Sequence, residues 1–370
     1  MSATSRRDPL GVYLHVPFCS VRCDYCAFAT WTDKGDLMGD YVDAVIREIT
    51  RARADGQLKT ASTVFVGGGT PSLLPARDLA RMIAAVAVED GAEVSVECNP
   101  ESMSAKLLRE LKAVGVTRIS MGVQSLVPHV LAGLGRPYVE GAVERAIALV
   151  ADAGFSSFNV DLVYGGAGES DADWRTTLSG VLQMSPRPPH VSAYALSVEP
   201  GTPLYAAPLR HPDDDVQAER YEVLDETLGE AGYGWYEISN FAMPGQRCQH
   251  NWSCWRQEDY LGFGCAAHSH VKGRRFANVW NLERYMSRVQ EGRSPVATEE
   301  HLSRAEREAE RLELGIRTVD GVNREALSEE DLELLSGLVE CVGDRVVLTR
   351  SGRLLANEVA LRLRATAPVP

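Results

Sequence analysis

The chain has 370 residues, with 45% hydrophobic and 24% charged residues, which is ordinary for a globular protein and excludes collagen-like or wholly disordered structure. Lys and Arg total 38 against 51 Asp and Glu, and a net charge of −13 argues against a general nucleic-acid-binding protein, because such proteins carry a basic surface. No segment approaches the ~18 consecutive apolar residues of a membrane span, and no apolar stretch follows the N-terminal MSATSRRDPL as in a signal peptide. We therefore expect a cytoplasmic protein.

Strand-like and helix-like segments alternate from residue 11 to about residue 200. The apolar runs that predict strands are residues 11–17, 62–69, 93–99, 118–125, 158–165 and 190–199. Helices are predicted between them, among others at residues 36–55, 75–88 and 105–115. Because near-continuous apolar strands separated by helices are typical of parallel sheets, the sequence predicts an α/β fold.

Polar residues or glycines follow at the C-terminal ends of these strands. They are Gly67 to Thr70, Glu97 with Asn99, Gln124, Asp161, and Tyr194 with Ser197. In parallel α/β sheets and barrels this edge carries the active site, so the pattern favours a site here. The alternative is that a polar residue merely ends each strand.

The remaining chain predicts two further regions. We place a barrel domain in residues 1–210, an accessory α/β segment in residues 211–300 and a helical module in residues 301–370. Near its end this module has the pattern of a helix, two strands joined around Gly343–Asp344 and a second helix, which resembles a small winged-helix module. Its many acidic residues favour a structural or docking role over DNA binding.

Three of the 8 cysteines lie on one loop after the first strand, with the spacing Cys19-x-x-x-Cys23-x-x-Cys26. Thiolates suit zinc or iron–sulfur clusters. Structural zinc takes four protein ligands, whereas a 4Fe–4S cluster held by three cysteines keeps one iron open for a cofactor. The motif therefore predicts a 4Fe–4S cluster of the radical-SAM type. A zinc site completed from elsewhere, or thiols without any metal, is the alternative.

Several sequence motifs follow one another along the chain. They are YLHVPFCSVRCDYC, VFVGGGTPSLL, VECNPES, ISMGVQS, GRPY, VDLVYG, SAYALSVEPGTPL and HNWSCW followed by YLGFGCAAHS. In this combination the chain resembles the oxygen-independent coproporphyrinogen III oxidase family of radical-SAM proteins, over residues 11 to about 365, and most closely its heme-chaperone branch. The resemblance implies a (β/α)6 partial TIM-type barrel with the cluster at its C-terminal mouth.

The resemblance also implies a binding site for S-adenosylmethionine at the open iron. The matching positions are Tyr13, Tyr25, Gly68, Gly69, Thr70, Glu97, Gln124, Arg136, Asp161 and Ala195. Glu97 would accept hydrogen bonds from ribose hydroxyls or the ammonium group, and Arg136 would pair with a carboxylate. Some of these positions serve a second S-adenosylmethionine in the oxidase. The alternatives are helix capping for Glu97 and Asp161 and a surface ion pair for Arg136.

Two departures distinguish the branches of this family. The oxidase branch has a further cysteine where this chain has Phe28, and the chaperone branch has an HNxxYW motif proposed to meet heme. Here that motif begins at His250, and Cys254 replaces its tyrosine. The resemblance implies heme contact at His250, with Cys248 as a competing ligand and with His268 and His270 nearby.

The sequence therefore favours a heme chaperone that carries a 4Fe–4S cluster and S-adenosylmethionine and transfers heme to an acceptor protein, such as a respiratory cytochrome or another membrane protein. An electron donor and a dimer are further expected partners, and nucleic acid is not. The alternative is oxygen-independent coproporphyrinogen III oxidation, a radical decarboxylation of two propionates. Phe28 and the motif at His250 argue against it, whereas cleavage of S-adenosylmethionine stays open in both cases. A DNA-linked regulator is disfavoured by the net charge.

Overall fold

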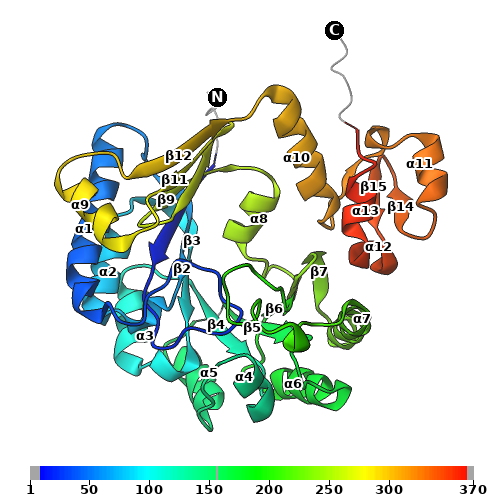
Figure 1. Ribbon diagram of the computed structural model, residues 1–370, viewed down its shortest axis with the longest axis horizontal. Helices are drawn as coiled ribbons and strands as arrows, with labels where there is room; N and C mark the ends of the chain where they lie inside the picture. Colours follow the sequence, from blue (N-terminus) through cyan, green and yellow to red (C-terminus); the bar gives the residue numbers. More distant parts are fainter. Residues whose placement is uncertain (1–8, 156, 365–370) are drawn as a thin grey trace.

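The computed structural model describes residues 9–155 and 157–364. Parallel strands in chain order form the centre of one twelve-stranded sheet. They are β1 (Leu10–Val16), β2 (Ala61–Gly68), β3 (Val88–Cys98), β4 (Arg118–Gln124), β5 (Ser157–Tyr164) and β6 (His190–Ala195). In Figure 1 the sheet curves into an arc, with helices on its convex side. The expected α/β partial barrel is confirmed.

The helices that follow these strands bury one face against the sheet. They are α1 (Met38–Ala54), α2 (Ala76–Ala84), α3 (Ala105–Ala113), α4 (Pro128–Gly133), α5 (Ala142–Asp152), α6 (Asp171–Gln183) and α7 (Asp214–Glu230). In α1 the buried Tyr41, Val45 and Ile49 recur every four residues and so share one face. The helix predicted at residues 75–88 is too long, because Val88 already pairs with Ala61 in the sheet. Short 3-10 turns occur at η1 (Gly35–Leu37), η2 (Pro71–Leu73), η3 (Pro100–Ser102), η4 (Pro208–Arg210) and η5 (Arg324–Ala326).

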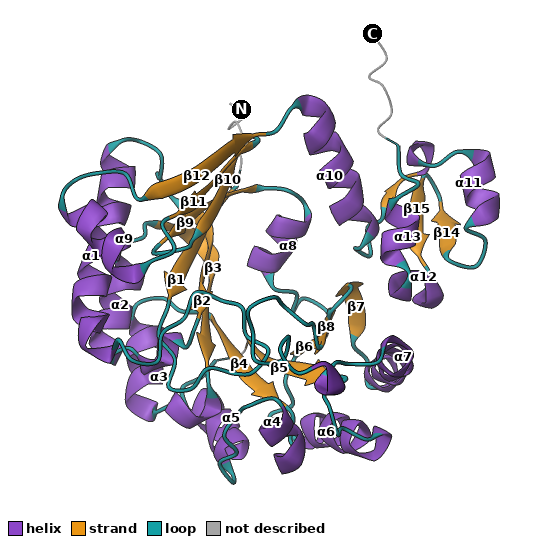
Figure 2. Cartoon of the chain, viewed as in Figure 1, coloured by secondary structure: helices purple, strands orange, loops and turns teal. Residues whose placement is uncertain are grey.

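The segment from residue 211 to residue 300 extends the sheet at both edges. On one edge β6 pairs with β8 (Asn240–Ala242), which pairs with β7 (Gly234–Glu237). On the other edge β1 is followed by β9 (Asp259–Phe263), β10 (His268–Val271), β11 (Arg274–Asn278) and β12 (Val296–His301). Figure 2 shows α8 (Gln249–Trp255) on the concave side of the arc, and α9 (Leu282–Gln290) packs beside α1.

The last part of the described chain has its own three-stranded sheet and its own core. The strands are β13 (Val322–Asn323), β15 (Arg345–Leu348) and β14 (Val339–Val342), in this spatial order. The helices are α10 (Arg304–Ile316), α11 (Glu329–Leu334), α12 (Arg350–Leu354) and α13 (Ala356–Ala360). The hairpin predicted around Gly343 is confirmed, and the winged-helix comparison stays a prediction. Within the ranges described, no helix is long and apolar enough to cross a bilayer.

Candidate functional site

Backbone hydrogen bonds close the loop that carries the three cysteines. The amide of Cys19 donates to the carbonyl of Trp31 at 3.0 Å, and the amide of Trp31 donates to the carbonyl of Pro17 at 2.7 Å. A further bond, from the Cys26 amide to the Cys23 carbonyl at 3.2 Å, forms a turn between the second and third cysteine. All three thiols are free and half-buried. The loop therefore presents them together beside the C-terminal end of β1.

Side chains from three other segments reach this loop. The Thr70 hydroxyl donates to the Cys19 sulfur, and Arg136 donates to the Cys23 sulfur, each at 3.7 Å. Asn99 joins the two donors, because its amide nitrogen donates to Thr70 at 3.1 Å and its oxygen accepts from Arg136 at 3.3 Å. Donors to sulfur favour the thiolate form that binds metal. Sequence reasoning placed Asn99 at a strand end but gave it no role in the site.

The donor set fits an iron–sulfur cluster better than a single metal ion. The loop offers three thiol ligands, those of Cys19, Cys23 and Cys26. Structural zinc needs four such ligands in a tetrahedron, whereas each cysteine of a 4Fe–4S cluster binds a different iron. Burial raises the pKa of the Cys19 and Cys26 thiols, so metal binding there releases protons.

The glycines at the end of β2 are required by close packing against the first strand and its loop. A side chain at Gly68 would collide with the ring of His15, and its φ of +110° also favours glycine. A Cβ at Gly69 would lie 2.6 Å from the carbonyl oxygen of Phe18. The Gly68 amide donates to the Glu97 carboxylate at 3.1 Å. This backbone is therefore held against the base of the cysteine loop.

Two half-buried carboxyl groups, those of Glu97 and Asp161, lie inside the barrel. Burial, reinforced by the charge of Asp161, raises the pKa of Glu97 to about 8. Burial also raises the pKa of Asp161, opposed by hydrogen bonds from Asn159 at 2.6 Å and from Ser120 at 3.1 Å. Neither carboxyl caps a helix, since Glu97 bonds Gly68 and Asp161 bonds its strand neighbours. Together they offer acceptors to a ligand rich in hydroxyl or ammonium groups.

The other predicted contacts lie on the same strands or on the loops that follow them. Tyr13 bonds His15 at 3.0 Å, and Tyr25 packs on the apolar cluster around Leu134. Gln124 ends β4 with a φ of +65°, a strained conformation that is frequent at functional sites, and Ala195 is exposed at the end of β6. The structure therefore brings the predicted cysteines, Thr70 and Arg136 together, and places the predicted carboxylates deeper in the barrel.

His250 lies on α8, on the concave side of the barrel, and is buried. Its Nδ1 is 2.9 Å from the Thr63 hydroxyl, and its ring stacks on Phe65 with centroids 5.3 Å apart. Burial lowers the pKa of His250 to about 4, so the imidazole is neutral at pH 7. Because Nδ1 is occupied by Thr63, Nε2 is the nitrogen that remains for a metal.

The other predicted candidates for heme contact, Cys248, His268 and His270, lie in different surroundings. The Cys248 thiol at the start of α8 donates to Glu93 at 3.4 Å, and the same carboxylate accepts from the His250 amide at 3.2 Å. His268 is exposed on β10, and His270 is buried there against the edge of Tyr260. Glu93 therefore fixes the start of α8, a role that sequence reasoning missed because it depends on contact between distant segments.

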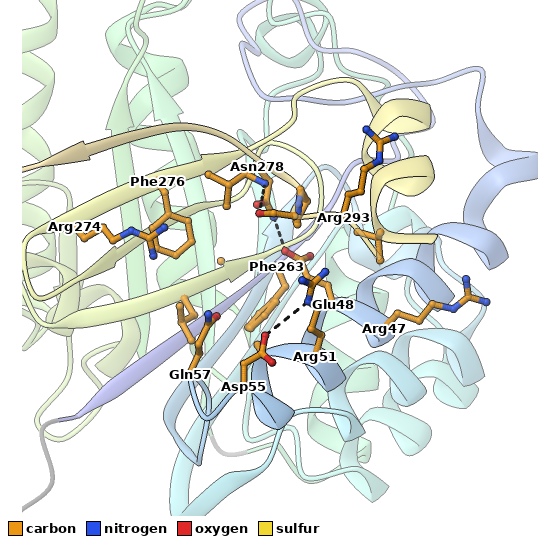
Figure 3. Close-up of a pocket in the computed structure, with 17 residues that line it drawn as sticks. Arg47, Glu48, Arg51, Asp55, Gln57, Phe263, Arg274, Phe276, Asn278 and Arg293 are labelled. Atoms are coloured by element: carbon orange, nitrogen blue, oxygen red, sulfur yellow. Dashed lines mark hydrogen bonds and ion pairs between the residues drawn. The ribbon is translucent and has the colours of Figure 1, made fainter. Parts of the chain in front are cut away.

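A cleft of about 250 Å³ lies elsewhere, between α1, β9, β11 and the loop before β12 (Figure 3). It includes Glu48, which accepts from the Tyr285 hydroxyl, the Gly264 amide and the Asn278 amide nitrogen at 2.5, 2.9 and 2.8 Å. None of the predicted site residues lines this cleft. Its central carboxylate is saturated by structural partners, which favours a structural role.

Comparisons with known proteins show which family the chain belongs to. The model of the Radical SAM superfamily matches residues 13–179. "Heme chaperone HemW" of Mycobacterium tuberculosis is 40% identical over 372 residues, covering 96% of this chain and 95% of that protein. The HemW proteins of Bacillus subtilis and Escherichia coli are 31% and 37% identical, covering 94% and 71% of this chain and 97% and 70% of their own lengths.

Among solved structures, coproporphyrinogen III oxidase (HemN) from Escherichia coli superposes with a TM-score of 0.82 and 23% identity, covering 97% of this chain and 91% of that chain. At this identity the likeness shows the fold alone. The family itself is shown by the sequence relatives, which match nearly the whole chain. This chain therefore belongs to the HemW family of radical SAM proteins.

Proposed function

We propose that this protein is a cytoplasmic heme chaperone, which binds heme and transfers it to an acceptor protein. The observation that carries the proposal is 40% identity over 96% of the chain to a protein named as a heme chaperone. Phe28, at the position where the oxidase branch has a fourth cysteine, is 64% exposed. This departure supports the chaperone and argues against coproporphyrinogen oxidation.

In this proposal Cys19, Cys23 and Cys26 hold the 4Fe–4S cluster, and Thr70 and Arg136 stabilise the sulfurs by hydrogen bonds. Such a cluster supplies an iron at which S-adenosylmethionine is bound and can be reductively cleaved. The contacts proposed for this cofactor are Tyr13, Tyr25, Gly68, Gly69, Thr70, Glu97, Gln124, Arg136, Asp161 and Ala195.

Heme contact is proposed at α8, with Nε2 of His250 toward the iron. Neutral imidazole is the form that binds metal, and the lowered pKa of His250 supports this form at pH 7. The hydrogen bond from Thr63 would orient the ring, as second-shell partners do for metal-bound histidines. Since the side chain is buried, a heme that reaches Nε2 requires displacement of neighbouring side chains.

The acceptor is proposed to dock at the cysteine-loop end of the barrel. Val21 and Phe28 on that loop are 46% and 64% exposed, and Tyr138 and Val139 after α4 are 48% and 44% exposed. Exposed apolar side chains that gather in one region are typical of protein-binding surfaces. The acceptor proposed for this surface is a membrane-bound respiratory cytochrome. The further partners proposed for the protein are an electron donor and a second copy of the chain.

The proposal is tested by anaerobic heme titration of the purified, cluster-loaded protein. We expect a stoichiometric change in the heme absorption spectrum, and about 10-fold or greater weakening in His250→Ala. His129→Ala is the control, because His129 is exposed on α4 and bonds only Asp173 among the described side chains. Absence of heme binding by the wild type, or conversion of coproporphyrinogen III to protoporphyrinogen, would refute the chaperone proposal. Unchanged binding by His250→Ala would exclude His250 alone.

A further inference from the structure

A line of hydrogen-bonded polar side chains crosses the barrel from Asp161 to the start of α8. Asp161 lies 2.6 Å from the amide nitrogen of Asn159, whose oxygen lies 2.6 Å from Nδ1 of His190. The other ring nitrogen, Nε2, lies 2.7 Å from the hydroxyl of Tyr236. That hydroxyl accepts from the amide of Cys248 at 3.3 Å, one residue before α8 begins.

The members of this line are shielded from water. Asn159, His190, Tyr236 and Cys248 are 3%, 1%, 0% and 3% exposed. In such surroundings an unmade hydrogen bond costs about 1–3 kcal/mol, because no solvent replaces it. A change at one member therefore has to be accommodated by its neighbours rather than by water.

While Asp161 is ionised, the partners fix the direction of every bond in the line. Asn159 directs its amide nitrogen at the Asp161 carboxylate and at Ser120, so its oxygen accepts from His190. Burial, with a smaller effect of Arg118, lowers the pKa of His190 well below its ordinary value, so the ring is neutral and carries one proton, on Nδ1. Nε2 then accepts from Tyr236, whose oxygen accepts from Cys248.

The same line has a second arrangement of opposite direction. If Asp161 is protonated, the Asn159 amide can turn so that its oxygen accepts from Asp161 and its nitrogen donates to Nδ1 of His190. The histidine proton then lies on Nε2, and Tyr236 must turn its hydroxyl hydrogen away from the ring. The hydroxyl hydrogen then loses the acceptor that it has in the first arrangement, so the second arrangement makes one buried hydrogen bond fewer. The state of Asp161 selects between the two arrangements.

Charged and titratable groups on the neighbouring strands affect the protonation state of Asp161. Glu97 on β3 disfavours a second negative charge, whereas Arg118 on β4 favours the Asp161 carboxylate. Tyr194 on β6 also faces Asp161. A ligand that donates hydrogen bonds to Asp161 favours the carboxylate, and hence the arrangement that the structure holds.

Tyr236 contacts α8 at a second point, where its ring meets the edge of the Trp252 ring at 5.8 Å between centroids. Its hydroxyl therefore bonds the residue that precedes this helix, and its ring contacts the helix itself. We propose that Asn159, His190 and Tyr236 are positioning residues that couple ligand binding at Asp161 to the placement of α8, so that S-adenosylmethionine changes the affinity for heme. This inference rests on the proposed function, in which Asp161 contacts S-adenosylmethionine and α8 contacts heme.

The coupling is measured by titrating heme into the cluster-loaded protein with and without saturating S-adenosylmethionine. We expect the two heme dissociation constants of the wild type to differ about 5-fold or more, the usual lower range of coupling between sites. In Tyr236→Phe the ratio falls to within about 2-fold of unity, because the bond to His190 and the acceptor for Cys248 are both lost. Tyr233→Phe is the matched control, since its buried hydroxyl donates to the Pro188 carbonyl outside the line.

A second readout does not require heme. The ¹⁵N chemical shifts of His190 are expected to show a neutral ring protonated on Nδ1 when S-adenosylmethionine is bound. Addition of S-adenosylmethionine is expected to change Trp252 fluorescence in the wild type and in Tyr233→Phe but not in Tyr236→Phe. A wild type that binds no heme but gives these responses refutes the proposed function and supports the relay. Absent responses, or a wild-type coupling ratio retained in Tyr236→Phe, overturn the relay.

Discussion

At the scale of single residues, Glu97 shows the effect of burial without a compensating positive charge. Glu97 accepts one backbone hydrogen bond, from Gly68, and has another carboxyl group as its neighbour. A carboxyl in such a position favours its neutral form. In the absence of ligand the folded protein therefore holds a protonated Glu97 under conditions in which an unfolded chain ionises it.

This predicts a pH-dependent gain of stability in Glu97→Gln. The pKa of Glu97 is raised from 4.5 to about 8, so folding loses stability as pH rises through that window, by at most about 1.4 kcal/mol for each unit crossed. The neutral amide removes this loss. We expect thermal denaturation of the ligand-free protein to show a higher Tm for the variant at pH 8 and nearly equal values at pH 4.5. A variant less stable than the wild type at pH 8 would contradict the argument, and exposed Glu89→Gln serves as the control.

The three cysteines could be predicted as a cluster site from the sequence alone, because they lie on one loop and their spacing is local. Asn99 and Tyr236 could not be assigned in this way, since their roles depend on partners from other strands. The environment of His250 also escaped prediction. Its sequence neighbours are tryptophans, but its contacts are Thr63 and Phe65 of β2, which a linear pattern does not reveal.

At the scale of elements, buried polar contacts hold the helices on the outer face of the sheet extension. Glu48 of α1 joins Tyr285 of α9, Asn278 of β11 and the backbone at Gly264. Burial raises its pKa to about 7, with these hydrogen bonds opposing the shift. The carboxyl is therefore the acceptor on which three separate segments depend.

We predict that Glu48→Ala destabilises the protein by about 2–4 kcal/mol, because it leaves several buried donors without an acceptor. Chemical denaturation at pH 7 measures the change in the free energy of unfolding. Asp40→Ala, at an exposed position of the same helix, controls for loss of a carboxylate and is expected to change it by less than about 0.5 kcal/mol. A similar cost for both variants would show that the buried contacts of Glu48 contribute little.

The parallel strands and their helices were predictable because each is encoded by a local apolar run and its periodicity. The extension of the sheet was not, because β9 pairs with β1 although it lies in the last third of the sequence, and β8 pairs with β6 across α7. Such pairings depend on strand edges that exist only once the central sheet has formed. The continuous sheet also explains why residues 211–300 do not form a separate layer.

At the scale of the whole molecule, and besides the small apolar cluster around Leu134, the described chain has a large core around the barrel sheet and a smaller one in the C-terminal module. A buried ion pair joins them, with Arg353 of α12 2.7 Å from Asp225 of α7. The guanidinium also lies 4.6 Å from the ring centroid of Trp235 on β7. This single side chain therefore connects the module to two elements of the barrel domain.

Arg353→Met tests whether this contact fixes the module. Removing one partner of a buried ion pair costs about 3–5 kcal/mol, because the other charge stays buried, although Arg350 still reaches Asp225 at 2.6 Å and lessens the loss. We expect hydrogen–deuterium exchange to accelerate in β13–β15 and α12 while β1–β6 remain protected. Arg350→Met is the control, since its side chain is 49% exposed and its removal leaves the buried pair intact. Uniform acceleration throughout both cores would instead mean that the module and the barrel unfold as one cooperative unit.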